Sequence, residues 1–458
     1  MNEYLDILGQ QPLLKIYTQI TLCFPVNDTS LHPEIINTLR HGLERLSSSF
    51  PWIAGQVINE GVRDGNSGLF KIVPLEEIPS LIIKDLRDDP SAPTMNDLRR
   101  AHFPFRMLDE SITAPRRTLP DASEEGLPAR VFLVQISFIY GGLLLTFVGQ
   151  HNTMDMTGQA HIIDLLSKAC RNEPFTNEEI CTGNLARYKL IAFLDDDSYK
   201  DDPDLARQIM KPAQLQPSSN DYGNKPTPPP PPKCIWKYFS FNADALASLK
   251  TLAEKDITSP PGYISTDDAL SAFIWQSIMR ARSHRLDPTT KCTFARAVDV
   301  RRYLDIPDSY PGLIQNMAYT DYTLKQLLEE PLGAIASQLR LAVDPKTSNL
   351  RHKSQILATF IDQSPEKSGF SFTASLDTQV DVMLSSWARP QLYDRDFNLG
   401  LGKPEAIRRP QFDPVESLIY FMPKRLDGEI AVAICLRVED MERFRVDKDV
   451  VKYSTYIE

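Results

Sequence analysis

The sequence has no long hydrophobic run. No apolar stretch approaches the roughly 18 residues that a helix needs to cross a bilayer, which argues against a membrane-spanning helix. The first six residues are acidic and lack both the basic stretch and the apolar core of a signal peptide. We therefore expect a cytoplasmic protein with no membrane partner.

Cysteine is scarce and positive charge is in deficit. The six cysteines form no C-x-x-C pair, and no histidine cluster has metal-ligand spacing, so we expect reduced thiols and no metal. A formal net charge of -10 argues against a nucleic-acid partner, because such binding depends on a basic surface. An anionic cofactor held in a local basic pocket is still compatible with this charge.

The length and composition are those of a folded protein with several domains. The chain has 458 residues, 42% hydrophobic and 24% charged, which is typical of two or three globular domains. An acidic segment leads into five consecutive prolines at 228–232, and such a run forms a semi-rigid extended spacer. We expect an N-terminal domain at 1–195, a linker at 196–233 and a C-terminal domain at 234–458. A ligand for a proline-binding domain is the alternative interpretation of the run.

The stretch from His151 to Asp155 is the best candidate for chemistry. It follows a hydrophobic hairpin pattern at 131–148 and precedes apolar residues spaced three and four apart, which indicate a helix. His151 is therefore expected at a strand end, where a neutral imidazole can act as a general base near neutral pH. Two alternatives stay open: Asp155 only caps the following helix, or both residues hold a metal.

Local patterns also predict elements in the rest of the chain. The proline-rich segment 85–128 is expected to be an irregular loop that wraps the surface rather than lines a pocket. The second half repeats the early strand and the late hairpin running into a helix, which indicates two similar halves or a chance recurrence of common units. Strands are predicted at 13–24, 69–73, 81–83, 234–241, 293–300, 416–422 and 429–436, and helices at 33–46, 243–255, 265–278, 324–342, 354–362 and 439–444.

These motifs resemble those of the BAHD acyltransferases. That family carries a His-x-x-x-Asp motif near mid-chain and an Asp-Phe-Gly-Trp-Gly motif near the C-terminus. Here the first is His151 to Asp155, and the second is present in altered form as Asp396-Phe397-Asn398-Leu399-Gly400. Within the family the chain is most similar to the fungal trichothecene 3-O-acetyltransferase branch. Supporting stretches are Pro51-Trp52-Ile53-Ala54-Gly55, Ser265 to Ala272, and Ser386-Trp387.

The resemblance implies a fold and an activity. The fold would be α/β, with two similar mixed-sheet domains of the chloramphenicol-acetyltransferase type and a channel between them. The activity would be acetyl transfer from acetyl-CoA to the C-3 hydroxyl of a trichothecene, which serves toxin self-protection or detoxification. His151 would be the general base in a ternary complex, and Asp155 would be held in place by Arg301.

Other site residues are expected from the same comparison and from hydrogen-bonding chemistry. Asp396 and Gly400 would shape a supporting turn, and Asn316 or Trp387 would contact the oxyanion or the substrate. Ser265 and Thr266 would meet the CoA phosphates, with a plain helix cap as the alternative. We expect a monomer. Acyl transfer to another fungal alcohol or an amine, and a non-catalytic binding protein of the same fold, are the alternative functions.

Overall fold

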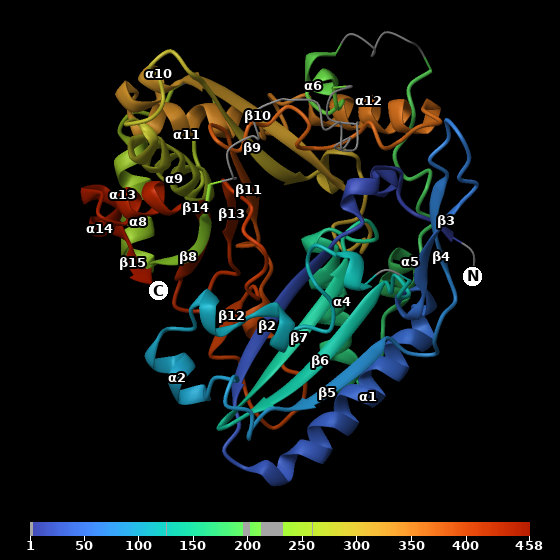
Figure 1. Ribbon diagram of the computed structural model, residues 1–458. Coiled ribbons are helices and arrows are strands. Elements are labelled where there is room, and N and C mark those ends of the chain that lie inside the picture. The colour runs from blue at the N-terminus through green and yellow to red at the C-terminus, as the bar shows by residue number, and fades with distance from the viewer. Residues whose placement is uncertain (1–2, 125, 196–201, 212–231, 259) are drawn as a thin grey trace, which may run out of the picture.

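The structure, a computed structural model, describes residues 3–124, 126–195, 202–211, 232–258 and 260–458 (Figure 1). Most of the predicted linker, 196–233, lies outside these ranges. Within them we find no helix with the length and apolarity that crossing a bilayer demands. The described chain builds three β-sheets, two of which are large and carry helices.

The first half builds four strands of a five-stranded sheet with the order β12-β2-β7-β6-β5, and β12 (Ala406–Arg408) is the edge strand. The predicted hairpin is present as β6 (Phe132–Ile139) and β7 (Gly142–Gln150), and β2 (Tyr17–Pro25) pairs antiparallel with β7. Helices α1 (His32–Ser49) and α4 (Met156–Cys170) pack against each other beside this sheet (Figure 1). The other elements are β1 (Glu3–Tyr4), β3 (Gln56–Glu60), β4 (Leu69–Val73), β5 (Ser80–Asp85), α2 (Met95–Arg100), α3 (Glu110–Thr113), α5 (Asn177–Gly183) and α6 (Pro203–Ala206).

The second half builds a seven-stranded sheet with the order β10-β9-β11-β13-β14-β8-β15. The predicted late hairpin is present as β13 (Leu418–Phe421) and β14 (Ile430–Arg437), and β14 leads directly into α13 (Val438–Arg445). This repeats the path from β7 into α4, so the two mixed α/β halves are similar, as expected. The other elements are β8 (Cys234–Phe241), α8 (Ala243–Glu254), α9 (Thr266–Arg282), β9 (Lys291–Asp299), β10 (Gln315–Thr323), α10 (Leu324–Glu329), α11 (Leu332–Leu341), α12 (Leu350–Gln363), β11 (Val382–Ser386), β12 (Ala406–Arg408), α14 (Lys448–Tyr453) and β15 (Thr455–Ile457).

One strand from the second half belongs to the sheet of the first half. β12 pairs antiparallel with β2, and Ile407 lies opposite Leu22. The range 234–458 therefore builds the whole seven-stranded sheet and also contributes an edge strand to the neighbouring sheet. Phe105 of the first half also stacks on Tyr238 of β8, with ring centroids 4.0 Å apart. The junction between the halves is thus both hydrogen-bonded and apolar.

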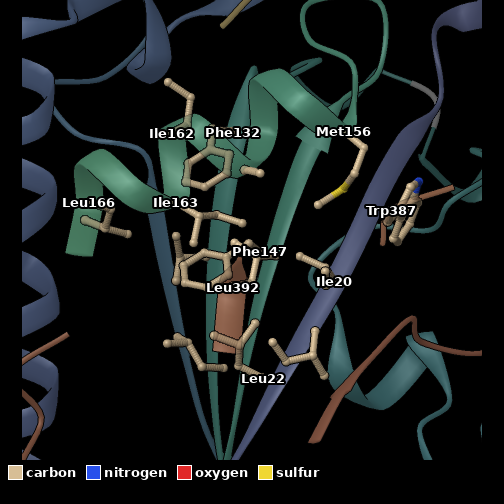
Figure 2. Packing of buried hydrophobic residues seen from close by; sticks show 14 of the residues in the cluster. Ile20, Leu22, Phe132, Phe147, Met156, Ile162, Ile163, Leu166, Trp387 and Leu392 are labelled. Atoms are coloured by element: carbon tan, nitrogen blue, oxygen red, sulfur yellow. The ribbon is translucent and has the colours of Figure 1, made fainter. Parts of the chain in front are cut away.

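Buried aliphatic and aromatic side chains fill the space between the first sheet and α4 (Figure 2). Ile162, Leu165, Leu166 and Ala169 of α4, the face that the spacing predicted, are buried. Ile163 of α4 and Phe147 of β7 belong to the same cluster as Ile162 and Leu166. This packing fixes the end of β7 relative to the start of α4, which is where His151 lies.

Several sequence predictions differ from the structure. The strand expected from residue 13 begins only at Tyr17, because Pro12 starts a short 3-10 turn. The helix expected over 324–342 is divided into α10 and α11, since Pro331 lacks the N–H that a continuous helix needs. The segment 85–128 contains α2 and α3 and contributes Thr118 and Leu119 to a cavity, so it does more than wrap the surface. The strands β1, β3, β10, β11, β12 and β15 were not predicted.

Candidate functional site

His151 lies one residue beyond the end of β7, as the sequence predicted. Its main-chain N–H donates to the carbonyl oxygen of Ile16 at 2.7 Å, which ties it to the residue before β2. Asp155 then caps α4, because its Oδ1 accepts the N–H of Gly158 at 2.8 Å. The strand end and the helix start together fix the backbone on either side of His151.

The carboxylate of Asp155 is bound by an arginine rather than by His151. Arg301 donates from Nη1 to Oδ2 at 2.9 Å and from Nη2 to Oδ1 at 3.1 Å. The N–H of Ile314 adds a third bond, to Oδ2 at 2.8 Å. With the cap bond from Gly158, these donors occupy both carboxylate oxygens. Asp155 therefore caps α4, which was one of the alternatives for this residue. It also binds Arg301, as the resemblance to the BAHD acyltransferases implied.

Arg301 fastens this corner to the second half of the chain. The guanidinium is fully buried and also donates to the carbonyl oxygens of Tyr310 and Gly312, at 2.9 and 2.7 Å. The loop that holds these carbonyls lies so close to α4 that a Cβ atom on Gly158 would come within 3.0 Å of the Pro311 carbonyl oxygen. A glycine is therefore needed in the first turn of α4.

The imidazole of His151 lines a cavity of about 360 Å³. Both halves of the chain contribute to its wall, which is mostly apolar, and one member of the lining, Arg409, carries a permanent charge. The lining includes Leu14, Tyr17, Thr18, Thr118, Leu119 and Met156 from the first half, and Gln315, Met317, Met383, Trp387, Phe412, Leu418 and Tyr420 from the second. Met156 and Trp387 are labelled in Figure 2.

The surroundings of His151 favour its neutral form. Burial lowers the pKa of the imidazole below its ordinary value of about 6.5, and it is the largest cause of the shift. The positive charge of Arg409 lowers the pKa further, while Asp155 and the nearby main-chain carbonyl groups oppose both effects. Nδ1 is buried without a hydrogen-bond partner. A neutral imidazole in a mostly apolar cavity can accept a proton from a bound hydroxyl group.

Sequence reasoning missed Arg409. It follows β12 directly, and its guanidinium lies over the rings of Phe412, Tyr420 and Trp387, with its central carbon 4.3, 4.6 and 5.3 Å from the ring centroids. A three-residue strand has no detectable periodicity, and an arginine in a polar stretch usually faces solvent. The sequence offered no signal that could have placed this charge beside His151.

Two predicted contact residues differ in position. Trp387 lines the cavity, and its Nε1 donates to Ser385 Oγ at 3.0 Å. Asn316 does not line the cavity. Its Oδ1 accepts from Gln208 Nε2 at 2.9 Å and its Nδ2 donates to Ser354 Oγ at 3.2 Å, because the alternation of β10 turns this side chain into the core. The expectation that Asn316 contacts an oxyanion therefore has no support in this geometry.

The candidate CoA residues are occupied by helix capping. Ser265 Oγ accepts the N–H of Asp268 at 3.1 Å, and the Asp268 carboxylate in turn accepts the N–H of Ser265 at 2.8 Å. Arg340 Nη2 also donates to Ser265 Oγ at 2.8 Å. Neither Ser265 nor Thr266 lines the cavity with His151. The geometry matches the helix-cap alternative.

The altered second motif forms a turn, as expected. Asp396 Oδ1 accepts the N–H of Asn398 at 2.8 Å, and Gly400 has a φ of 70°, in the left-handed region that favours glycine. Arg171, just after α4, donates to the main-chain oxygen of Asp396 at 2.6 Å. The turn thus supports the far end of α4 and does not line the cavity.

One cluster within the described ranges has metal-ligand chemistry. His284, Glu439 and Asp440 place potential ligand atoms within 4.8 Å of one another. However, Arg285 Nη2 already binds the Asp440 carboxylate at 2.7 Å, and Arg282 Nε lies 3.4 Å from it. Two guanidinium groups disfavour a cation at this point. The cluster gives no support for a catalytic metal.

Two similar mixed α/β halves that share an apolar cavity and one histidine define the two-domain class of acyltransferases. The match to the Transferase family covers residues 111–450, and that to the trichothecene 3-O-acetyltransferase-like N-terminal domain covers 16–170. The chain therefore belongs to the Transferase family, which confirms the predicted enzyme class of O-acyltransferase and the resemblance to the BAHD acyltransferases.

Individual relatives match over the whole chain. An O-acetyltransferase from Cryptosporiopsis is 53% identical over 458 residues, covering 100% of this chain and 98% of that protein. A trichothecene 3-O-acetyltransferase from Fusarium sporotrichioides is 51% identical over 456 residues, covering 99% and 96%. The crystal structure of a Fusarium sporotrichioides enzyme with coenzyme A and T-2 covers 100% of both chains, with a TM-score of 0.93 and 49% identity.

Proposed function

We propose that this chain transfers an acetyl group from acetyl-CoA to the C-3 hydroxyl of a trichothecene. The observation that carries the proposal is the imidazole of His151 in a mostly apolar cavity between the two halves. A cavity of about 360 Å³ with a mostly apolar wall and few polar groups suits a polycyclic terpenoid. The Fusarium relative is named for this reaction, and a Fusarium neighbour was crystallised with coenzyme A and T-2.

In the proposed reaction His151 is the general base. Its Nδ1 is enclosed by protein, so we assign proton acceptance to Nε2. Nε2 takes the hydroxyl proton while the hydroxyl oxygen attacks the thioester carbonyl carbon. The tetrahedral intermediate collapses, the C–S bond breaks, and the imidazolium returns the proton to the CoA thiolate. Such general-base assistance contributes about two to four powers of ten in rate.

Asp155 and Arg301 have a supporting function in this proposal. All the observed bonds of the Asp155 carboxylate lead to Arg301 and to main-chain N–H groups, so it holds the loop rather than polarises His151. Trp387 forms part of the acceptor wall, since it lines the cavity. Asp396 and Gly400 support the far end of α4 through their turn. Acetylation of the toxin would serve self-protection or detoxification.

A second candidate is acetylation of another secondary-metabolite alcohol. The relative from Cryptosporiopsis is named simply as an O-acetyltransferase, at 53% identity over the full length of this chain. The catalytic geometry would be the same, and the acceptor would differ. The side chains of the cavity wall would then set the choice of alcohol.

The test compares two acceptors with purified protein and acetyl-CoA. One is a trichothecene with a free C-3 hydroxyl, and the other is the same compound acetylated at C-3 and free at C-15. Release of the CoA thiol and the mass of the product are followed. We expect acetylation of the first compound only. Equal or faster reaction of the blocked compound would refute the C-3 assignment, and reaction with an unrelated alcohol alone would favour the second candidate. Binding of the acceptors without any turnover would favour the alternative of a non-catalytic binding protein.

A further inference from the structure

Arg409 carries a buried charge that its protein surroundings leave almost uncompensated. The residue is 2% exposed, and its guanidinium makes one hydrogen bond, from Nη2 to Thr118 Oγ1 at 3.5 Å. Nε is buried without a partner, and among the described residues no carboxylate forms an ion pair with Arg409. A guanidinium has five N–H donors, so most of them are unused. An isolated buried charge is strongly unfavourable for folding, and a function is the usual reason to retain one.

The contacts around Arg409 hold the guanidinium without satisfying its donors. Cation–π contacts with Phe412, Tyr420 and Trp387 offset part of the lost hydration and orient the group. Burial raises the pKa of Glu110, and the positive charge of Arg409, the smallest of the causes that act on this carboxyl group, opposes the rise. Oε2 of Glu110, however, already accepts hydrogen bonds from Gln19 and from the N–H of Thr118. The raised pKa weakens Glu110 further as a counter-ion. The N–H donors of Arg409 are therefore available to a molecule in the cavity.

The preceding residue, Arg408, provides a comparison from the same segment of the chain. Arg408 is also buried, at 3% exposure, but it donates to the carbonyl oxygens of Phe103, Ile407 and His102 at 3.1 to 3.3 Å. Arg408 does not line the cavity. The N–H donors of Arg408 are thus bound by protein acceptors, whereas Arg409 lines the cavity and has few protein acceptors for its N–H donors.

We infer that Arg409 determines acceptor specificity, because its guanidinium binds an oxygen of the acceptor remote from the reacting hydroxyl and repels protonated amines. This inference rests on the proposed function and names the acceptor class of the same site. The lining contains no carboxylate that could bind an ammonium group. A neutral alcohol with further ester, ether or hydroxyl oxygens supplies the missing acceptor for Arg409. An amine would bring a second positive charge next to it.

The first test measures kcat and KM for two alcohols with wild type and Arg409→Met. One alcohol is a trichothecene with several oxygens, and the other is a bicyclic monoalcohol with no further oxygen. We expect Arg409→Met to lower kcat/KM for the trichothecene about 10- to 100-fold, mainly through KM, because a hydrogen bond to a charged group is lost. The value for the monoalcohol should stay within about threefold. An equal loss of kcat for both alcohols would overturn the inference.

Arg408→Met is the matched control. It removes the same side chain one position earlier, so we expect a lower melting temperature and an unchanged ratio of kcat/KM for the two alcohols. Arg409→Met should melt at or above the wild-type temperature, because an uncompensated buried charge is removed. A large loss of stability in Arg409→Met together with an unchanged ratio would show that Arg409 is structural. If Arg409→Met does not fold, Arg409→Lys, which lacks the planar fork of donors, takes its place in the kinetic comparison, and an unchanged ratio would again overturn the inference.

A binding measurement separates this inference from the proposed reaction. Calorimetric titration of each alcohol and of a primary amine of similar size is done without acetyl-CoA, on wild type and Arg409→Met. We expect wild type to prefer the oxygen-rich alcohol and Arg409→Met to lose that preference while binding the ammonium form more tightly. If no acceptor is acetylated but this binding pattern is observed, the proposed reaction is refuted and the inferred role of Arg409 in specificity is supported. If the two proteins bind all three compounds alike, the specificity is wrong.

Discussion

Arg301 meets both carboxylate oxygens of Asp155, at 2.9 and 3.1 Å, although the two residues are 146 positions apart in the chain. Asp155 caps the start of α4 in the first half, and Arg301 follows β9 in the second. The pair therefore fixes the helix after His151 to the opposite half of the molecule. We therefore expect the position of His151 in the shared cavity to depend on this contact.

We expect Arg301→Ala to lower the free energy of unfolding by about 3–5 kcal/mol, because the buried carboxylate of Asp155 loses its ion-pair partner. Asp155→Asn should cost less, because Arg301 keeps its ion pair with Asp299 at 2.8 Å. Activity should fall in parallel, and the double variant should be no less stable than the weaker single variant. Urea denaturation of all three proteins measures this. Arg351→Ala, which removes an exposed ion pair with Asp305, is the control and should cost at most about 1 kcal/mol. Additive losses in the double variant would contradict the pairing.

His151→Ala should lower kcat about 10²- to 10⁴-fold, because the general base is removed. The melting temperature should change little, since a side chain that lines a cavity makes few packing contacts. His161→Ala is the matched control: this histidine lies on α4 outside the cavity and should leave kcat within about threefold. Retention of more than a tenth of the wild-type activity in His151→Ala would refute the general-base assignment.

The pH profile of kcat/KM should rise on its acid side at a pH below about 6.5, because the base is active when neutral and burial lowers its pKa. Arg409→Met should move this rise to higher pH, since the arginine also lowers the pKa of His151. Steady-state kinetics measured from about pH 4.5 to about pH 8, a range that spans the ordinary pKa of histidine, give both shifts. A rise that moves to lower pH in the variant would contradict the electrostatic coupling.

Gly158→Ala should destabilise the protein by about 1–3 kcal/mol and reduce activity, because the new Cβ would come within 3.0 Å of the Pro311 carbonyl oxygen and push α4 away from the opposite half. Gly369→Ala is the control, since nothing lies within 4 Å of a Cβ at that position. It should be neutral or slightly stabilising. The melting temperature and the turnover of both variants are measured. Equal values for the two variants would show that α4 does not pack tightly against the loop that carries Pro311.

Asn316→Ala should lower the free energy of unfolding by about 1–3 kcal/mol, because buried hydrogen bonds to Gln208 and Ser354 are lost. Its kcat should change far less than the roughly 10²- to 10³-fold expected for loss of an oxyanion donor. Denaturation and single-turnover kinetics provide the two values. A rate loss of the oxyanion-hole size with unchanged stability would restore Asn316 as a catalytic candidate.

The sequence alone determined the local framework around His151. Alternating and helical apolar spacings are set by the geometry of strands and helices, so the hairpin of β6 and β7 and the face of α4 were predicted correctly. The two widely separated motifs and the supporting stretches indicated the family, and the resemblance implied the pair of Asp155 and Arg301. The break at Pro331 also had a local cause, the missing N–H of proline, although the sequence prediction passed over it.

The tertiary structure alone decided which side chains share the cavity with His151. Arg409 reaches it because β12 pairs with β2 across the two halves, and three residues of strand carry no periodic signal. Asn316 turns away because the register of β10 directs its side chain into the core, and that strand was not predicted. Ser265 is taken by a cap and by Arg340 from another helix. These outcomes depend on contacts between distant segments, whose geometry is fixed only when both sheets have formed.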